Sequence, residues 1–244
     1  MFSTLKMLLV YLPLGFVTGV IGIPYSFLVG NIGLLYRVAM WVTKTGVRVA
    51  GIRVEVTGLE NVPVGRPCIF MSNHVSNLDP PVELPMLPGR SSVLLKKELM
   101  NIPILGRAMR MAQFVPVERG SKRESAQASV TAAAEVFRSG LNILVYPEGT
   151  RSRDGRLAMF KKGPFYLAKE TGAPIVPIAI SGTETMMHKG SVGITPGVAR
   201  MQVLPVIESA EFETREDLLR AVREAIAGAL PVEMRPASDE SKTD

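Results

Sequence analysis

The chain has 244 residues, 47% of them hydrophobic but only 6% aromatic, and its formal net charge is +6 at pH 7. This length allows one large domain with a sizeable core. The positive charge suits a partner that carries phosphate, which includes nucleic acid, a phospholipid surface, coenzyme A and an acidic carrier protein. Cys68 is the only cysteine, which excludes an internal disulfide and favours a reducing compartment. We expect Cys68 to be a small buried hydrophobic residue.

An uncharged segment covers residues 7–36. As one straight helix it would measure about 45 Å, more than the ~30 Å hydrocarbon core of a membrane. Because proline breaks or kinks a helix, Pro24 predicts two shorter apolar pieces. Positive residues flank both ends of the run, which favours a re-entrant hairpin in one leaflet over a single span; they are Lys6, Arg37, Lys44 and Arg48. A cleaved signal peptide is the weaker alternative, because the run exceeds a usual hydrophobic region.

The rest of the chain predicts an α/β sheet. Residues 37–50 place apolar and basic side chains at helical spacing, which indicates an amphipathic helix at the membrane surface or on a protein core. From residue 52 onward, short β-rich runs alternate with helical windows, which is typical of a sheet flanked by helices. The predicted strands are 52–56, 68–72, 93–96, 114–117, 142–146, 175–180 and 201–207.

Two helices are predicted as scaffold. One runs through Ala126 and Phe137, and the other begins at Thr214, where Asp217 completes a capping-box arrangement. The residues after Pro231 lose apolar periodicity, which predicts a frayed tail.

The segment MSNHVSNLDPP, residues 71–81, carries a histidine and an aspartate five positions apart. It follows a strand-like run and ends in prolines that suit a first helical turn, so His74 and Asp79 flank a strand-to-helix turn. There the carboxylate can fold back onto Nδ1 of the imidazole and leave Nε2 to accept a proton. An imidazole with the ordinary pKa of ~6.5 can deprotonate an attacking alcohol. Taken alone, the pair also fits a structural histidine beside a helix-capping aspartate.

A second segment, VYPEGTRSRDG at residues 145–155, again runs from a strand into a loop. Its proline and glycines suit a turn with exposed backbone N–H groups, and Arg151 can clamp a phosphate with two hydrogen bonds. Glu148 could orient the acceptor or His74. The alternative is a charged surface turn in which Glu148 and Arg151 pair with each other.

Four blocks in order make the chain resemble the glycerolipid acyltransferases, and within them the 1-acylglycerol-3-phosphate acyltransferases. Asn73-His74-x4-Asp79 resembles the catalytic block of this family. The other three similar blocks are Val115–Arg119, Tyr146–Arg151 and Ala173–Ile180. Two departures are mild: Tyr146 stands where phenylalanine is usual, and Pro116 and Val117 interrupt a longer aliphatic run.

The resemblance implies a role for each matching residue. His74 would deprotonate the acceptor hydroxyl, which attacks an acyl thioester directly without an acyl-enzyme, while Asp79 orients His74. Glu148 is predicted as the third catalytic residue, and its role, to orient the acceptor or His74, stays open. The substrate-binding residues would be Lys97, Arg119, Gly149, Thr150 and Arg151, with both arginines on the acceptor phosphate and backbone N–H groups near Gly149 facing the oxyanion. Lys96 is the rival of Lys97, because neighbours at a strand end point to opposite sides.

The apolar segment, the loss of periodicity after Pro231 and the resemblance together predict a partition, a location and partners. Membrane-anchoring helices would cover residues 1–50, an acyltransferase domain of the glycerol-3-phosphate acyltransferase-like fold residues 51–231, and a flexible tail residues 232–244. The enzyme would lie on the cytoplasmic face of the cell membrane, need no cofactor, and use acyl-CoA or acyl-carrier protein as donor. Its acceptor would be lysophosphatidic acid, and it would bind no nucleic acid. Another lysophospholipid or an acylated amino-acid lipid is the alternative acceptor.

Other classes fit the sequence less well. A serine hydrolase would need Gly-x-Ser-x-Gly, and a nucleotide hydrolase Gly-x4-Gly-Lys-Ser/Thr; neither motif occurs in the chain. Two histidines and one cysteine match no metal-ligand spacing, and we expect His188 to lie in a surface loop. A non-catalytic basic module that binds membrane surfaces would explain the charge and the apolar segment, but it leaves the His74–Asp79 pair without a purpose.

Overall fold

The computed structural model describes residues 2–118, 123–188 and 190–236, around an eight-stranded mixed sheet. The strand order is β1-β7-β6-β2-β5-β3-β4, and β8 pairs with β6 beside this path. Adjacent strands are parallel except where β6 meets β7 and β8. The strands are β1 (Ile52–Thr57), β2 (Ile69–Ser72), β3 (Ser91–Lys96), β4 (Val115–Val117), β5 (Asn142–Val145), β6 (Pro174–Ser181), β7 (Gly197–Val203) and β8 (Ile207–Glu208). The predicted mixed α/β sheet is therefore confirmed.

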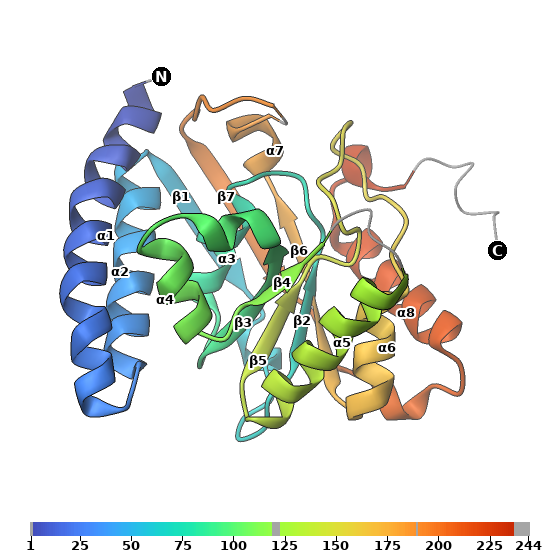
Figure 1. Ribbon diagram of the computed structural model, residues 1–244. Helices are drawn as coiled ribbons and strands as arrows, with labels where there is room; N and C mark the ends of the chain where they lie inside the picture. Colours follow the sequence, from blue (N-terminus) through green and yellow to red (C-terminus); the bar gives the residue numbers. More distant parts are fainter. Residues whose placement is uncertain (1, 119–122, 189, 237–244) are drawn as a thin grey trace.

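Helices cover both faces of this sheet (Figure 1). The α-helices are α1 (Phe2–Val29), α2 (Gly33–Val49), α3 (Asp79–Glu83), α4 (Leu105–Met111), α5 (Arg123–Arg138), α6 (Gly163–Thr171), α7 (Thr183–Met186) and α8 (Arg215–Ala229). Short 3₁₀ turns form η1 (Leu59–Asn61), η2 (Leu84–Met86), η3 (Lys97–Asn101), η4 (Ser209–Glu211) and η5 (Val232–Met234). The predicted cap of α8 is confirmed, because the Thr214 hydroxyl accepts a hydrogen bond from the backbone N–H of Asp217 at 3.1 Å.

Alternate residues of the central strands enter two separate cores. Along β2, Ile69 and Met71 pack with α5, α6 and α8, whereas Phe70 packs on the opposite face beside η2. Every residue of β2 is buried, because a parallel strand in mid-sheet is covered on both sides. This explains why the strands appear in the sequence as continuous apolar runs. The alternation also places Ser72 and Tyr146 on the same face as Phe70.

The last predicted strand differs from the structure. The sequence predicts one strand over residues 201–207, but β7 begins earlier, at Gly197, and the chain leaves the sheet at Leu204 and Pro205 before β8. Proline has no N–H to donate to a sheet, so it ends the ladder there.

The first two helices form a hairpin, but the chain does not break at Pro24 as predicted. Both Pro13 and Pro24 lie inside α1, and the chain reverses at Gly30, whose φ is 65°. A proline removes one hydrogen bond from a helix, whereas reversal needs a left-handed residue, which glycine supplies. The rest of α1 packs along α2, and Gly46 makes room for the Tyr11 ring, which a Cβ there would approach to 2.0 Å.

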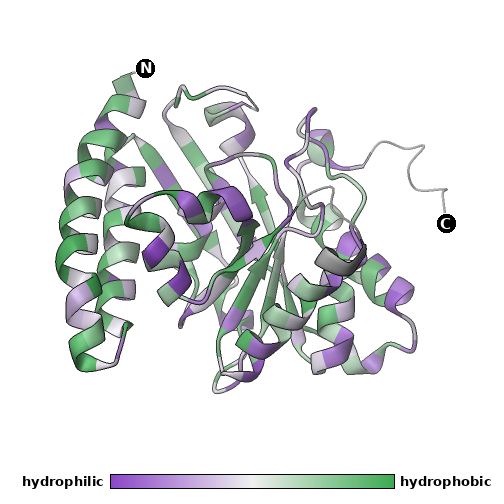
Figure 2. Cartoon of the chain, in the orientation of Figure 1, coloured by the Kyte–Doolittle hydropathy of each residue, from purple (hydrophilic) through white to green (hydrophobic). Residues whose placement is uncertain are grey.

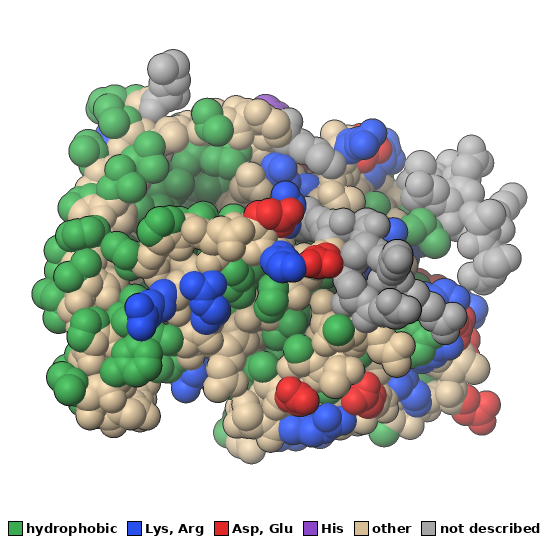
Figure 3. All heavy atoms as spheres, viewed as in Figure 1, with side chains coloured by type: hydrophobic (Ala, Val, Ile, Leu, Met, Phe, Trp, Pro, Cys, Tyr) green, Lys and Arg blue, Asp and Glu red, His purple; other side chains and the backbone are tan. Residues whose placement is uncertain are grey.

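Most of the α1 surface is apolar and exposed. Of the 25 exposed large hydrophobic residues in the described chain, 13 lie in α1, so this one helix carries more than half of them. Figures 2 and 3 show the same apolar surface along α1 at the edge of the molecule. Among the described residues α1 is the one helix long and apolar enough to cross a membrane.

The predicted flexible tail is wrong for its first residues. Residues 232–234 form η5, Met234 is buried, and its carbonyl accepts a hydrogen bond from the backbone N–H of Leu157 at 2.8 Å. Met234 belongs to the same core cluster as residues of α8, and a single buried apolar side chain has no periodicity by which the sequence could reveal it. Residues 237–244 lie outside the described part of the chain.

Candidate active site

Two loops meet at the carboxyl edge of the central strands. Strands β2 and β5 are parallel neighbours, with Met71 opposite Val145. The segments that follow them therefore leave the sheet side by side, and these are the two segments that the sequence singles out. The backbone N–H of Ser152 donates to the carbonyl of His74 at 2.8 Å, which ties the two loops together.

The predicted contact between His74 and Asp79 is present. Nδ1 of His74 lies 2.8 Å from Oδ2 of Asp79. The same oxygen accepts hydrogen bonds from the backbone N–H groups of Val75 and Ser76, and Oδ1 accepts one from the Thr183 hydroxyl at 2.6 Å. Asp79 is fully buried and His74 nearly so. The carboxylate is therefore held by four hydrogen bonds, and with Nδ1 engaged the imidazole presents Nε2 as its basic nitrogen.

Glu148 holds the main chain of His74 and not its ring. Oε1 of Glu148 accepts a hydrogen bond from the backbone N–H of His74 at 2.8 Å, and Oε2 accepts one from the N–H of Ala158 at 3.3 Å. Burial raises the pKa of Glu148 to about 7. Of the two roles left open for Glu148, the geometry therefore supports orientation of His74.

The sequence did not reveal two further supports of His74. The Tyr146 ring stacks on the imidazole, with centroids 4.2 Å apart and planes inclined by 23°. The Asn73 side chain exchanges two hydrogen bonds with the backbone of Ile180, at 2.8 and 2.9 Å, and anchors the turn to β6. Asn73 is part of the first family block, which is a signal that could have identified its position but not its partner.

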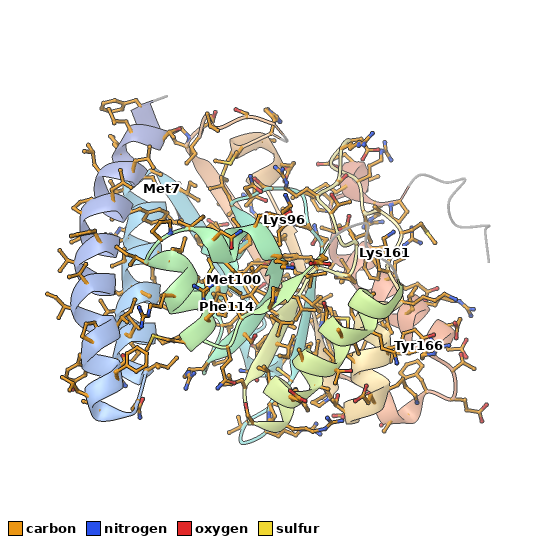
Figure 4. The ribbon with its side chains drawn as sticks, viewed as in Figure 1. Met7, Lys96, Met100, Phe114, Lys161 and Tyr166 are labelled. Carbon is orange, nitrogen blue, oxygen red and sulfur yellow. The ribbon has the colours of Figure 1, made fainter. Side chains whose placement is uncertain are left out.

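An apolar cavity of about 570 Å³ adjoins the histidine. Its basic lining residues are His74, Lys96 and Arg151, which lie at or beyond the carboxyl ends of β2, β3 and β5. The rest of its lining is mainly aliphatic and aromatic and comes largely from α2, α3, β3 and α4, with further residues from η2, η3 and the loop before β4. Figure 4 labels two of its residues, Lys96 and Phe114, beside β3 and α4. A cavity of this size and polarity suits a ligand with a long apolar part and an anionic end.

The predicted substrate-binding residues do not all line the cavity. Arg151 lines the cavity, but Lys97 is exposed and forms an ion pair with Glu118, and the rival Lys96 is the lysine in the lining. Arg119 lies outside the described residues. Gly149 and Thr150 are exposed, and the N–H of Gly149 donates within its own turn to the Tyr146 carbonyl at 3.0 Å.

Neither Cys68 nor His188 lines this cavity. Cys68 is fully buried in β-sheet packing, and burial raises the pKa of its thiol to about 12. His188 is exposed, as expected. Within the described ranges no group of three or more His, Cys, Asp or Glu side chains could hold a metal ion.

Comparisons with known proteins show the family and the fold. The profile of the family described as Acyltransferase matches residues 53–181, which is more than half of the chain. A 1-acyl-sn-glycerol-3-phosphate acyltransferase of Borreliella burgdorferi is 32% identical over 80% of this chain and 75% of its own length. A chloroplastic enzyme of the same name from Brassica napus is 37% identical over 68% of this chain, which spans only 47% of that relative.

A solved structure is similar over almost the whole chain. The crystal structure of the 1-acyl-sn-glycerophosphate (LPA) acyltransferase PlsC from Thermotoga maritima has a TM-score of 0.79 and 27% sequence identity, and the match covers 92% of each chain. The matched profile includes both loops that meet at His74. The chain therefore belongs to the acyltransferase family.

Proposed function

We propose that this chain transfers a fatty acyl group from an acyl thioester to the free 2-hydroxyl of 1-acylglycerol-3-phosphate, which gives phosphatidic acid. The observation that carries the proposal is the placement of the buried His74–Asp79 pair beside an apolar cavity with two cationic side chains. The relatives named as acyltransferases of this lysolipid support the same acceptor.

The reaction needs one base and no covalent enzyme intermediate. Nε2 of His74 takes the proton from the acceptor hydroxyl as its oxygen attacks the thioester carbonyl carbon. The new C–O bond forms, the C–S bond breaks, and the imidazolium returns the proton to the leaving thiolate. Asp79 keeps Nδ1 protonated and stabilises the positive charge that develops on the ring.

The acceptor phosphate would lie at the cationic end of the cavity. Arg151 offers directed donors and Lys96 a point charge. We retain Arg119 as a second arginine for the phosphate on the basis of the family block alone. The acyl chain would occupy the aliphatic part of the cavity, where removal of apolar surface from water stabilises binding by about 25 cal/mol per Å².

The α1–α2 hairpin would anchor the enzyme in one leaflet at the cytoplasmic face. α1 packs along α2, and α2 in turn contacts α3, η2 and β1 of the catalytic domain. If α1 crossed the bilayer, this packing would draw the charged domain to membrane depth, which is costly. A hairpin that lies in the interface avoids that cost.

The test is release of free thiol by the purified full-length protein in mixed micelles. Acyl-CoA and acyl-carrier protein are each offered with lysophosphatidic acid and with lysolipids of larger headgroups. We expect release that depends on lysophosphatidic acid and is lost in His74→Ala. His188→Ala, which removes the other histidine of the chain, is the matched control and should retain activity. Faster release with another lysolipid would replace the proposed acceptor, and release independent of any acceptor would overturn the transferase assignment.

A further inference from the structure

A third buried carboxyl group, besides those of Asp79 and Glu148, is linked to the histidine through Tyr146 but has no part in the mechanism above. Glu83, at the end of α3, is fully buried. Its Oε2 accepts a hydrogen bond from the Tyr146 hydroxyl at 2.6 Å, and its Oε1 is hydrogen-bonded to Ser72 Oγ. Both partners are hydroxyl groups and not cations, so these contacts alone do not compensate a buried negative charge.

The surroundings of Glu83 favour its neutral form. Burial, and secondarily the nearby charge of Asp79, raise the pKa of Glu83 to about 8. A protonated carboxyl has one O–H to donate. Ser72 Oγ, whose own hydrogen can go to the Asn73 carbonyl oxygen 3.2 Å away, is the available acceptor. The neutral acid therefore satisfies every polar atom in this group.

The hydrogen bonds of Glu83 connect it to the imidazole of His74 along two paths. From Glu83 one path runs through Ser72 to the backbone of Asn73, next to His74, and the other runs through the Tyr146 hydroxyl to the aromatic ring stacked on His74. The hydrogen bond that Nδ1–H of His74 donates to Asp79 fixes the position of Nδ1, but a single bond leaves the imidazole free to tilt about it. The stacked face of Tyr146 limits that tilt.

We propose that Glu83 is a positioning residue for the His74 base: by holding the Tyr146 hydroxyl, it keeps the Tyr146 ring against the imidazole. The inference rests on the proposed function, in which His74 is the base. It also accounts for the departure at position 146, since tyrosine, unlike phenylalanine, has a hydroxyl through which Glu83 can hold it.

Four variants test the proposal in the full-length protein. Glu83→Gln keeps both bonds, since its carbonyl can accept from Tyr146 and its amide can donate to Ser72. Glu83→Leu removes both, and Tyr146→Phe removes one while the ring stays. The fourth combines Glu83→Leu with Tyr146→Phe. We expect Glu83→Leu to lower kcat by about 10- to 100-fold, as misplacement of a catalytic group does, with little change in acceptor KM. Glu83→Gln should retain nearly the wild-type kcat.

The double variant separates one positioning unit from two independent effects. If Glu83 acts through Tyr146, the double variant should lose no more kcat than Glu83→Leu alone. The proposal is overturned if the kcat losses of the two single variants multiply in the double variant. It is also overturned if Glu83→Leu keeps the wild-type kcat, or if Glu83→Gln is as slow as Glu83→Leu. If Glu83→Leu fails to fold, Tyr146→Phe and Glu83→Gln decide the matter: the first should be slower than the wild type and the second not.

A spectroscopic measurement distinguishes failure of this proposal from failure of the proposed function. The chain has two histidines, so a His188→Gln background leaves one imidazole, that of His74, for ¹⁵N NMR. Its ring signals should shift or broaden in Glu83→Leu and Tyr146→Phe but keep their positions in Glu83→Gln, whether or not turnover is observed. Tyr166→Phe, which alters a half-exposed ring on α6, is the control. Unchanged ring signals in every variant would overturn the positioning role even in an active enzyme.

Discussion

The carboxylate of Glu148 accepts a hydrogen bond from the backbone N–H of His74 at 2.8 Å, across 74 positions of the sequence. Through its other oxygen it also binds the N–H of Ala158. One buried side chain thus joins the turn after β2 to the loop that precedes α6. The position of the base therefore depends on a residue that does not touch the imidazole.

We predict that Glu148→Ala loses both stability and turnover. It leaves two backbone N–H groups without their acceptor, and each unsatisfied buried group costs about 1–3 kcal/mol. For a protein of this size, 1 kcal/mol corresponds to roughly 2–4 °C of melting temperature. The melting temperature from calorimetry and kcat should therefore both fall. Both should fall less in Glu148→Gln, because its carbonyl oxygen can still accept from the N–H of His74. A higher acceptor KM at an unchanged melting temperature would instead place Glu148 on the substrate.

His74→Ala should remove nearly all turnover and leave membrane association intact. Loss of a general base lowers the rate by roughly 10²- to 10⁴-fold. Asp79→Asn keeps an oxygen near Nδ1 but weakens support of the imidazolium, so it should lose less kcat. Initial rates and vesicle flotation on the same preparations check both statements. A purified His74→Ala protein with wild-type rates would exclude the general-base mechanism.

The sequence predicted local features well and long-range contacts poorly. Strands such as β2 were visible because burial on both faces makes the whole run apolar, and the His74–Asp79 contact was visible because five residues separate the pair. The bond from Tyr146 to Glu83 spans 63 positions, and no local pattern encodes such a distance. The choice between Lys96 and Lys97 depended on which side of the β3 end faces the cavity, which two adjacent lysines cannot indicate.

Arg151→Ala should raise the acceptor KM and change the donor KM little. A charged hydrogen bond of ~1.5–3 kcal/mol corresponds to roughly 10- to 150-fold in acceptor use. Arg151→Lys should recover only part of the loss, because lysine lacks the planar pair of donors. The competing view makes Arg151 a structural partner of neighbouring carboxylates. It predicts a lower melting temperature with unchanged acceptor saturation, so both quantities are measured on each variant.

The exposed face of α1 should determine membrane binding. Leu9→Glu with Phe16→Glu places two charges on α1 at side chains that are 64% and 59% exposed, so the fold should survive while binding to vesicles weakens. Val64→Glu is the matched control, since Val64 is 97% exposed but lies outside α1. Equal loss of flotation in both proteins would contradict a specific anchor.

The hairpin and the single span differ in where the N-terminus lies. In a Cys68→Ser background, a cysteine at Phe2, which is 71% exposed, can be labelled with a reagent that does not cross membranes. A hairpin places this residue on the same side as the catalytic domain. Labelling only from the opposite side would establish a span.

Glu83→Gln should change how stability depends on pH. The carboxyl of Glu83 has a pKa of about 8 in the folded protein against 4.5 as its ordinary value. Between these values the folded state binds more protons than the unfolded state, so the free energy of unfolding falls as pH rises. The contribution of Glu83 is therefore fully present below about pH 4.5 and is lost as pH rises through about 8. Glutamine cannot ionise and has no such loss.

The melting temperature of Glu83→Gln relative to the wild type should therefore increase between pH 5 and pH 8. Each 1 kcal/mol of difference corresponds to roughly 2–4 °C. Glu148, whose pKa is raised to about 7, contributes equally to both proteins and cancels in the difference. Glu60→Gln, an exposed glutamate in η1, controls for the loss of one negative charge. If the melting temperatures of Glu83→Gln and the wild type instead change in parallel across this pH range, Glu83 is already ionised in the folded protein. The neutral form of Glu83, and the hydrogen bonds assigned to it here, would then be wrong.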